Sequence, residues 1–173
     1  MDFTEILFEI DEGVAVITLN RPEARNALAP VMRQELAHAL KTVREKAGEE
    51  VRALILTGAG GAFCAGGDVK SMGSRLKSAA LAREALRDDH QKMIDLLNIE
   101  VPVISLIDGA AAGAGANIAL AADFVLATPE GFFIAGFCKN WAYSRLGRYV
   151  HSSKASRVTK SEGTHFFWST RLC

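Results

Sequence analysis

The sequence predicts an α/β fold, because short apolar runs typical of strands alternate with segments of helical periodicity. The central example is the apolar run at residues 101–107, which is followed by a turn of glycines and alanines and then by helix-forming residues 117–122. In such a unit, backbone N–H groups at the start of the helix can point toward a negatively charged group. Small residues in the turn also let a ligand approach the main chain closely.

The N-terminal elements are equally clear in the sequence. Residues 6–10 and 14–19 flank a short turn and predict a β-hairpin. An irregular polar loop follows at residues 20–28. Pro30 suits the first turn of a helix. Apolar residues then recur at helical spacing at Met32, Leu36, Leu40 and Val43.

The middle of the chain continues the alternation. Gly48 ends the predicted helix, and residues 51–57 have the apolar pattern of a strand. The loop at residues 58–68 is rich in glycine, and residues 79–98 predict an amphipathic helix. The apolar face of that helix is expected at Leu86, His90, Met93 and Leu97. After the central turn, residues 123–127 predict a further strand.

Composition narrows the function classes. The chain has 173 residues, enough for one domain with a hydrophobic core, and 49% hydrophobic and 23% charged residues are ordinary for a soluble protein. Its 20 basic and 20 acidic side chains cancel, so neither nucleic acid nor a membrane is the expected partner. We see no signal peptide and no apolar stretch long enough to span a bilayer. Three cysteines without metal-ligand spacing favour a cytoplasmic location and no metal site.

Two glycine-rich loops, at residues 58–68 and 109–115, each follow a predicted buried strand. Neither carries the dinucleotide-binding fingerprint or the phosphate-loop signature, so a nucleotide site is disfavoured. One such loop alone is more typical of a tight crossing between a strand and a helix. Two of them together favour a shared site lined by backbone N–H groups, which suits a carbonyl oxygen that gains negative charge during a reaction.

Three sequence blocks resemble the signature segments of the crotonase (enoyl-CoA hydratase/isomerase) superfamily, in the expected order, and the resemblance covers residues 3 to about 132. The blocks are N-R-P-E-A-R-N-A-L at 20–28, G-A-F-C-A-G-G-D-V-K at 61–70 and P-V-I-S-L-I-D-G-A-A-A-G-A-G-A-N at 102–117. The resemblance implies a spiral of ββα repeats, a homo-trimer or hexamer, and an acyl-CoA thioester as substrate with no other cofactor.

The resemblance also implies which residues form the site. The backbone N–H groups of Gly67 and Ala114 would form an oxyanion hole. The residues expected along the coenzyme A moiety are Ala24, Ala65, Gly66, Asp68, Val69 and Lys70. A lysine suits the phosphates of coenzyme A, although Lys70 taken alone is more typical of a solvated charge.

The acid or base beside the oxyanion hole decides the chemistry. Hydratases of this family carry a glutamate where this chain has Asn117, and an amide cannot accept a proton from water, so simple hydration loses one carboxylate. Asn117 either orients the substrate or is satisfied locally. His90 stands twelve residues before Pro102, where dehalogenase-like members place a histidine base, but Asp88 and Asp89 replace the aromatic neighbours of those members. A packed, structural histidine is the alternative.

The tail has neither helical nor strand periodicity, so we expect residues 1–132 to form the crotonase-like core and residues 133–173 an irregular or disordered tail. When residues 141–155 are back-translated and shifted by one nucleotide, they become compatible with G-L-I-P-D-W-G-G-M-Y-I-L-P-R-L, which is similar to a family segment. We therefore interpret the tail as out of frame, from a point between Phe132 and Ala135. Coding DNA whose codons forbid the shifted reading would refute this interpretation.

In the shifted frame, the second glutamate position of the hydratases is a phenylalanine, and the aspartate of I-P-D-W-G-G is the one well-placed carboxylate. A single carboxylate facing an oxyanion hole suits double-bond isomerisation of an enoyl-CoA. Hydration, or hydrolysis and dehalogenation with a histidine partner, are the alternative reactions. The non-enzyme alternative is a truncated protein that binds coenzyme A thioesters. We expect the chain as written to be weakly active or inactive, and poorly stable because apolar surface is left uncovered.

Overall fold

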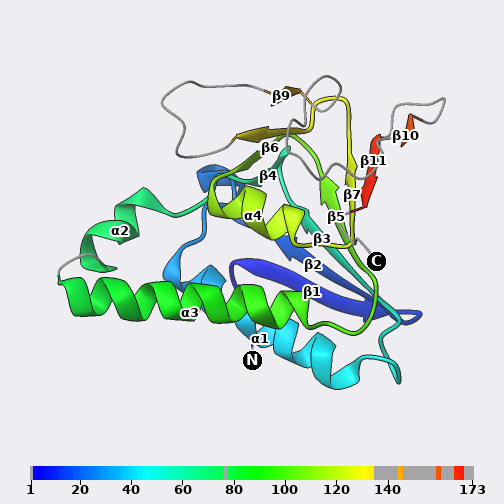
Figure 1. Ribbon diagram of the computed structural model, residues 1–173, viewed down its shortest axis with the longest axis horizontal. Coiled ribbons are helices and arrows are strands. Elements are labelled where there is room, and N and C mark those ends of the chain that lie inside the picture. Colours follow the sequence, from blue (N-terminus) through cyan, green and yellow to red (C-terminus); the bar gives the residue numbers. More distant parts are fainter. Residues whose placement is uncertain (1, 76–77, 135–143, 146–158, 161–165, 170–173) are drawn as a thin grey trace.

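The computed structural model describes residues 2–75, 78–134, 144–145, 159–160 and 166–169 (Figure 1). Its larger sheet has seven strands in the order β1-β2-β3-β5-β7-β11-β10. These strands are β1 (Ile6–Asp11), β2 (Val14–Leu19), β3 (Ala53–Gly58), β5 (Val103–Ile107), β7 (Phe124–Ala127), β10 (Thr159–Lys160) and β11 (Phe166–Ser169). β1 and β2 form the predicted antiparallel hairpin, and β2, β3, β5 and β7 run parallel. β11 pairs antiparallel with β7 and with β10.

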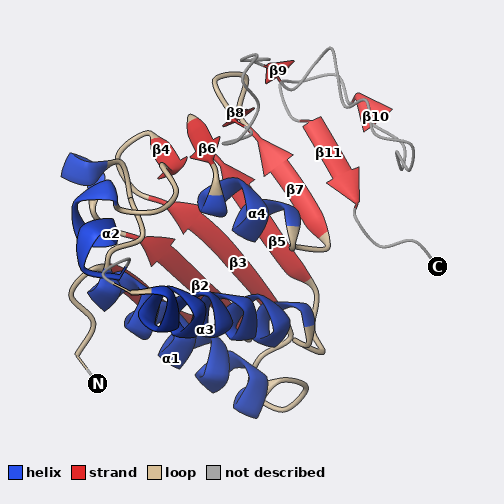
Figure 2. Ribbon diagram, turned by 60° about the vertical axis from the view of Figure 1, so that its left-hand side comes forward, coloured by secondary structure: helices blue, strands red, loops and turns tan. Residues whose placement is uncertain are grey.

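A smaller sheet has the order β4-β6-β8-β9. Its strands are β4 (Ala62–Cys64), β6 (Ala110–Ala112), β8 (Phe132–Ile134) and β9 (Ser144–Arg145). Three strands of the larger sheet each lead into a strand of the smaller one: β3 into β4, β5 into β6 and β7 into β8 (Figure 2). At the corner between β5 and β6, Gly109 has a φ of 69°, and a Cβ there would collide with the carbonyl oxygen of Gly61. The fold is therefore mixed α/β, as predicted, with paired strands repeated along the chain.

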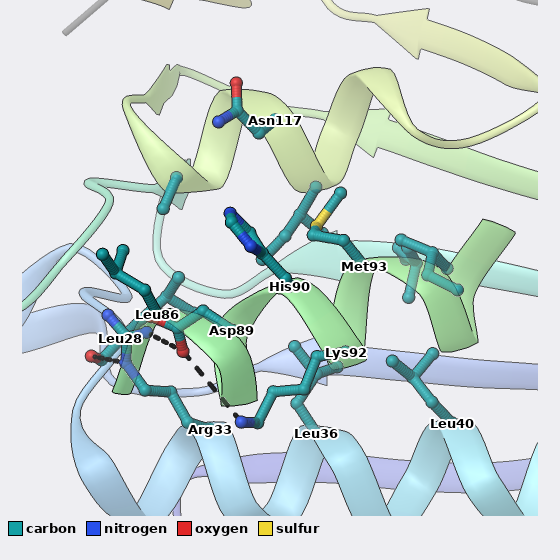
Figure 3. Close-up of a pocket in the computed structure, with 14 residues that line it drawn as sticks. Leu28, Arg33, Leu36, Leu40, Leu86, Asp89, His90, Lys92, Met93 and Asn117 are labelled. Carbon is teal, nitrogen blue, oxygen red and sulfur yellow. Dashed lines mark hydrogen bonds and ion pairs between the residues drawn. The ribbon is translucent and has the colours of Figure 1, made fainter. Parts of the chain in front are cut away.

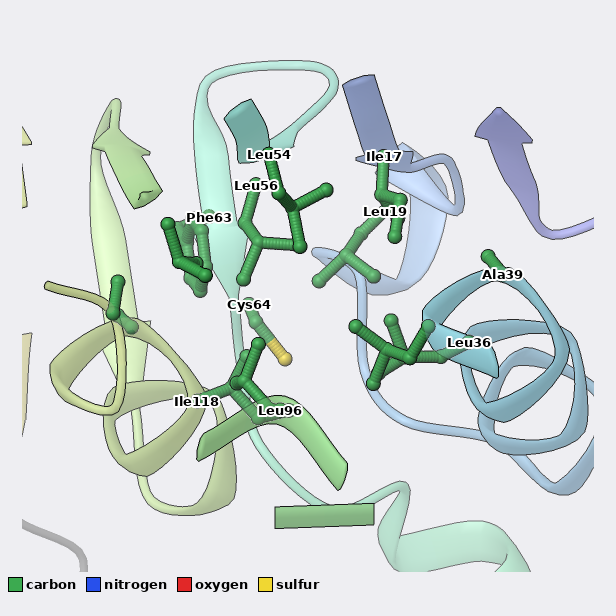
Figure 4. Close-up of a cluster of buried hydrophobic side chains, with 14 of the residues drawn as sticks. Ile17, Leu19, Leu36, Ala39, Leu54, Leu56, Phe63, Cys64, Leu96 and Ile118 are labelled. Carbon is green, nitrogen blue, oxygen red and sulfur yellow. The ribbon is translucent and has the colours of Figure 1, made fainter. Parts of the chain in front are cut away.

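The helices cover one face of the larger sheet (Figure 2). They are α1 (Pro30–Lys46), α2 (Val69–Arg75), α3 (Ala79–Leu97) and α4 (Ala114–Leu120), with a short 3-10 turn at Pro22–Ala24. The core lies between α1, α4 and the sheet, where β-strand side chains meet helical ones (Figure 4). Its members include Ile17, Leu19, Leu36, Leu54, Leu56, Phe63, Leu96 and Ile118.

Helix α1 is fastened to the first strand by two carboxylates. Its N-cap, Ala29, offers no side-chain acceptor, and Glu5 supplies one instead by accepting a hydrogen bond of 2.8 Å from the Met32 N–H. Glu35, only 1% exposed, accepts hydrogen bonds from the backbone N–H groups of Thr4, Glu5 and Ile6 and from the Thr4 hydroxyl. The start of the chain is therefore held against the middle of α1.

The predicted apolar face of α3 is wrong in part. Leu86 and Leu97 are 57% and 61% exposed, His90 is exposed, and Met93 is half-buried. The buried residue of the helix is Leu96. The reason is that α3 spans a cavity, described below, and packs closely only near its C-terminal end. The predicted face is therefore right for Leu86, His90 and Met93, which line this cavity beside Leu96, and wrong for Leu97.

The short strands of the smaller sheet were not predicted either. β4 and β6 lie inside the segments expected to be glycine loops, because strands of three small residues carry no detectable alternation. Within the tail, residues 133–134 belong to β8, and residues 144–145, 159–160 and 166–169 form short strands. The remaining tail residues, on which the predictions of irregularity and of a shifted frame chiefly fall, lie outside the described part of the chain.

Candidate active site

A cavity of about 220 Å³ lies between α1, α3 and α4 (Figure 3). Its wall is mostly aliphatic, so it suits an apolar group better than a hydrated one. The apolar lining residues are Leu28, Leu36, Leu40, Leu56, Leu86, Met93, Leu96, Ala114 and Ile118. The polar lining residues are Arg33, Asp89, His90, Lys92 and Asn117.

Ala114, one of the two predicted backbone donors, lines this cavity at the start of α4. The preceding Gly113 has a φ of 50°, which turns the chain from β6 into the helix. As the first residue of α4, Ala114 has no intrahelical acceptor for its N–H. Among the residues that the structure describes, this N–H has no other hydrogen-bond partner.

Gly67, the other predicted donor, lies between β4 and α2, beside the residue Leu28 that lines the cavity. The Leu28 N–H donates to the Gly66 carbonyl at 2.8 Å. A Cβ on Gly66, where φ is 93°, would lie 2.8 Å from the Ala112 carbonyl oxygen and 3.5 Å from the Ala114 nitrogen. Over the described residues the Gly67 N–H, too, has no partner. The structure thus brings the two glycine loops into contact, and each carries one N–H that is unpaired within the described part of the chain.

His90 and Asn117 both line the cavity, on different helices. His90 points from α3 toward α4, while Asn117 is on the outward side of α4 (Figure 3). Both side chains are exposed, so neither is a buried structural residue of the core. The structure therefore places the imidazole between α3 and α4 and the amide on the opposite side of α4 (Figure 3).

An ion-pair cluster in the cavity wall was not predicted. The Arg33 guanidinium pairs with Asp89, whose carboxylate is also 4.0 Å from the Lys92 ammonium. The Arg33 Nε donates to the Leu28 carbonyl at 2.8 Å. Helical spacing could have revealed part of this cluster, because Arg33 stands three residues before Leu36 and seven before Leu40, on the face that forms the cavity.

The residues expected along coenzyme A lie outside the cavity, where loop 20–28 runs beside the segment 65–70. Ala65, Val69 and Lys70 are exposed, whereas Ala24 and Asp68 are half-buried and Gly66 is buried. The Ala65 N–H donates to the Arg25 carbonyl at 2.9 Å, which holds the two segments together.

Asp68 has structural partners of its own in this surface. Its carboxylate accepts a hydrogen bond of 3.0 Å from the Lys70 N–H at the start of α2, and lies 3.7 Å from the Arg21 guanidinium. Its side chain therefore links the two segments and fixes the entry to α2.

Cys64 is buried beneath the two loops and is not a nucleophile. Burial raises the pKa of its thiol to about 11, against smaller opposing effects of the Gly66 N–H and the Arg33 charge. The thiol donates to the Asn26 carbonyl at 3.0 Å and accepts from the Gly66 N–H at 3.4 Å. It therefore stays protonated at neutral pH and serves as a link between loops.

Metal-ligand clusters and membrane-spanning helices are both absent from the described residues. No group of three or more His, Cys, Asp or Glu side chains in this part of the chain is arranged to hold a metal ion. None of its helices is both long and apolar enough to cross a membrane.

Comparison with known proteins places the chain in a family. The family model described as "Enoyl-CoA hydratase/isomerase" matches residues 9–162. A Rhodobacter capsulatus protein named "Probable enoyl-CoA hydratase" is 42% identical over 140 residues, which are 80% of this chain and 52% of that protein. The "1,2-epoxyphenylacetyl-CoA isomerase" of Escherichia coli is 38% identical over 136 residues, which are 78% of this chain and 51% of that protein.

A solved structure agrees with these relatives. The crystal structure of an enoyl-CoA hydratase/isomerase from Xanthobacter autotrophicus Py2 matches with a TM-score of 0.71 and 36% identity, over 76% of this chain and 49% of that one. The chain thus spans about half the length of the relatives it matches. The chain belongs to the enoyl-CoA hydratase/isomerase family and has the crotonase fold.

Proposed function

We propose that the chain binds an acyl-CoA thioester and stabilises its enolate with the N–H groups of Gly67 and Ala114. The observation that carries this proposal is the contact between the two glycine loops, each of which has one N–H without a partner among the described residues, and Ala114 on one of them lines an apolar cavity. A thioester oxygen gains negative charge when a proton leaves the adjacent carbon. Preorganised backbone donors stabilise that charge without reorganisation during the reaction.

The two parts of the substrate would occupy two parts of this surface. The acyl group suits the aliphatic cavity between α1, α3 and α4. Coenzyme A would lie along the surface formed by Ala24, Ala65, Gly66, Asp68, Val69 and Lys70, where the exposed ammonium of Lys70 suits a phosphate. No further cofactor is needed for chemistry at the carbon next to a thioester.

Isomerisation of a carbon–carbon double bond is the reaction that we favour. Hydration by two carboxylates would need a free carboxylate at the cavity, and among the described lining residues the one carboxylate is Asp89, which pairs with Arg33 and Lys92. Asn117 cannot act as a base. Isomerisation moves one proton between two carbons of the enolate and requires a single base, a role open to His90 in this part of the chain.

A second reaction class follows from the same histidine. An imidazole at the cavity could activate a nucleophile for thioester hydrolysis or dehalogenation, and His90 lines the cavity as that role requires. The relatives include proteins named as hydratases and as isomerases, so hydration is the further alternative. A protein that binds the thioester without turnover is the non-enzyme alternative.

The test measures binding and turnover separately with the 173-residue chain. Calorimetric titration with a non-hydrolysable acyl-CoA analogue reports binding. Parallel assays follow a 3-enoyl-CoA converting to the 2-enoyl isomer, hydration of a 2-enoyl-CoA, and thiol release from an acyl-CoA. We expect binding, with isomerisation faster than hydration. Faster hydration would refute the isomerase proposal, and absence of binding would refute the function altogether.

A further inference from the structure

Asn26 is a polar side chain of the core whose amide is hydrogen-bonded through both its oxygen and its nitrogen, and the proposed reaction gives it no role. It is fully buried, and its backbone has a φ of 56°, a left-handed conformation that asparagine tolerates better than most residues. Its Oδ1 accepts a hydrogen bond of 2.8 Å from the Arg21 N–H, and its Nδ2 donates to the carbonyls of Ala59 at 2.8 Å and Ala62 at 2.7 Å. Both amide hydrogens and the amide oxygen are thus used.

These bonds join two segments that are far apart in the sequence. Arg21 belongs to the loop at residues 20–28, whereas Ala59 and Ala62 flank the corner between β3 and β4. The same loop donates from the Leu28 N–H to the Gly66 carbonyl and accepts from the Ala65 N–H. Loop residues before and after Asn26 therefore form hydrogen bonds to the segment that carries Gly67.

Cys64 links the main chain of Asn26 to the segment that carries Gly67. The Cys64 thiol donates to the Asn26 carbonyl at 3.0 Å and accepts from the Gly66 N–H at 3.4 Å, one residue before Gly67. The other proposed donor, Ala114, is held near the same side chain. Its neighbour Gly115 lies so close to Cys64 that a Cβ on Gly115 would be 2.7 Å from the Cys64 sulfur. Helix α4, with Ala114 at its start, thus packs directly on the thiol that Asn26 holds.

We propose that Asn26 is a positioning residue that sets the Gly67 N–H in register with the Ala114 N–H. The inference rests on the proposed function, since it assigns Asn26 a part in the geometry of that oxyanion hole. An aspartate at position 26 would have nearly the same size but would present oxygen to the carbonyls of Ala59 and Ala62 in place of two N–H donors. That change would shift loop 20–28 and, through Cys64, the Gly66–Gly67 peptide.

The experiment reads the polarisation of a bound carbonyl, which does not require turnover. A 2-enoyl-CoA labelled with ¹³C at the thioester carbonyl is added to the chain, and the carbonyl stretch is followed by difference infrared spectroscopy. We expect a red shift on binding to the unsubstituted chain and loss of most of it in Asn26→Asp, with the affinity for the thioester little changed. Where turnover is measurable, kcat should fall by about 100-fold with a similar KM. A residue that only stabilised the fold would not separate these quantities.

Two further variants keep the test decisive. Asn98→Asp makes the same chemical change at an exposed residue after α3 and should leave the red shift intact. Cys64→Ala removes only the thiol link, and should lose part of the red shift even if Asn26→Asp does not fold, as judged by circular dichroism. A full red shift in a folded Asn26→Asp or Cys64→Ala chain would overturn the role of Asn26 alone. A red shift missing from the unsubstituted chain would instead overturn the proposed function.

Discussion

Replacement of Glu35 by glutamine should destabilise the fold strongly, because four hydrogen bonds converge on this buried carboxylate. Oε1 accepts from the Thr4 N–H at 2.7 Å and the Thr4 hydroxyl at 2.8 Å, and Oε2 accepts from the N–H groups of Glu5 at 2.8 Å and Ile6 at 3.0 Å. A glutamine can keep its oxygen toward Glu5 and Ile6. Its amide nitrogen would then face the Thr4 N–H, so donor would meet donor.

The magnitude follows from those contacts. A hydrogen bond to a charged group contributes about 1.5–3 kcal/mol, and a neutral one about 0.5–1.5 kcal/mol. Glu35→Gln loses one charged bond and weakens two others, and water can reach the exposed Thr4, which limits the loss. We therefore expect the free energy of unfolding to fall by about 3 kcal/mol. The midpoint of thermal unfolding should fall by roughly 6–12 °C for a chain of this size.

The pH dependence gives an independent readout. Burial raises the pKa of Glu35, but the hydrogen bonds from Thr4, Glu5 and Ile6 outweigh burial and leave this pKa below its usual value. A carboxyl whose pKa is lowered by folding stabilises the fold above its unfolded-state pKa, and that stability is lost as the pH falls through the folded-state value. The difference between the two chains should therefore be full at neutral pH and shrink below about pH 4.

Urea unfolding, followed by circular dichroism between pH 3 and pH 7, measures both quantities. Glu45→Gln is the matched control, because Glu45 lies on the same helix with an exposed carboxylate that forms an ion pair with Lys41 on the surface. The control should change the free energy of unfolding very little. A loss at Glu35 that equals the control, or a difference that grows as the pH falls, would refute the reasoning.

Three further predictions concern the site. Ala114→Pro removes one proposed oxyanion donor at a helix position that tolerates proline. It should lower kcat for isomerisation by about 100-fold or more while circular dichroism shows an intact fold. An unchanged rate would exclude this N–H as a donor. Asn117→Glu should raise the rate of 2-enoyl-CoA hydration relative to isomerisation in paired assays, whereas Asn117→Gln should not; equal effects would rule out a carboxylate-specific cause. Burial raises the pKa of Cys64 to about 11, so this thiol should react with iodoacetamide at pH 8 far more slowly in the folded chain than in urea. Mass spectrometry of the Cys64 peptide measures both rates, and equal rates would contradict its burial.

Local sequence pattern predicted the elements that are long and strongly periodic. The hairpin β1–β2, helix α1 with Leu36 and Leu40 on its buried face, and strand β5 are confirmed. Pattern could not orient α3, because the periodicity of Leu86, Met93 and Leu97 marks an apolar stripe without saying whether a neighbour or a cavity lies against it. The smaller sheet was missed because β4 and β6 have only three small residues each.

The candidate site was predictable only where it is made of backbone. The small residues around positions 67 and 114 predicted two turns in which backbone N–H groups could be exposed, and the structure brings these loops together. The ion pair between Arg33 and Asp89 depends on two helices whose mutual placement no local pattern specifies. Asn26 was visible as part of a polar loop, but its three partners lie 5 to 36 residues away and are apparent only in the fold.

The succession of strand pairs has a consequence for how the donor pair arises. Gly67 follows β4 and Ala114 follows β6, so the two proposed donors stand at corresponding points of consecutive coils of a short solenoid. In a solenoid the interactions that matter most are those between adjacent coils. The relative position of the two residues thus depends on contacts between adjacent coils. These contacts are the pairing of β3 with β5 and of β4 with β6, together with the bridge from loop 20–28 to Gly67.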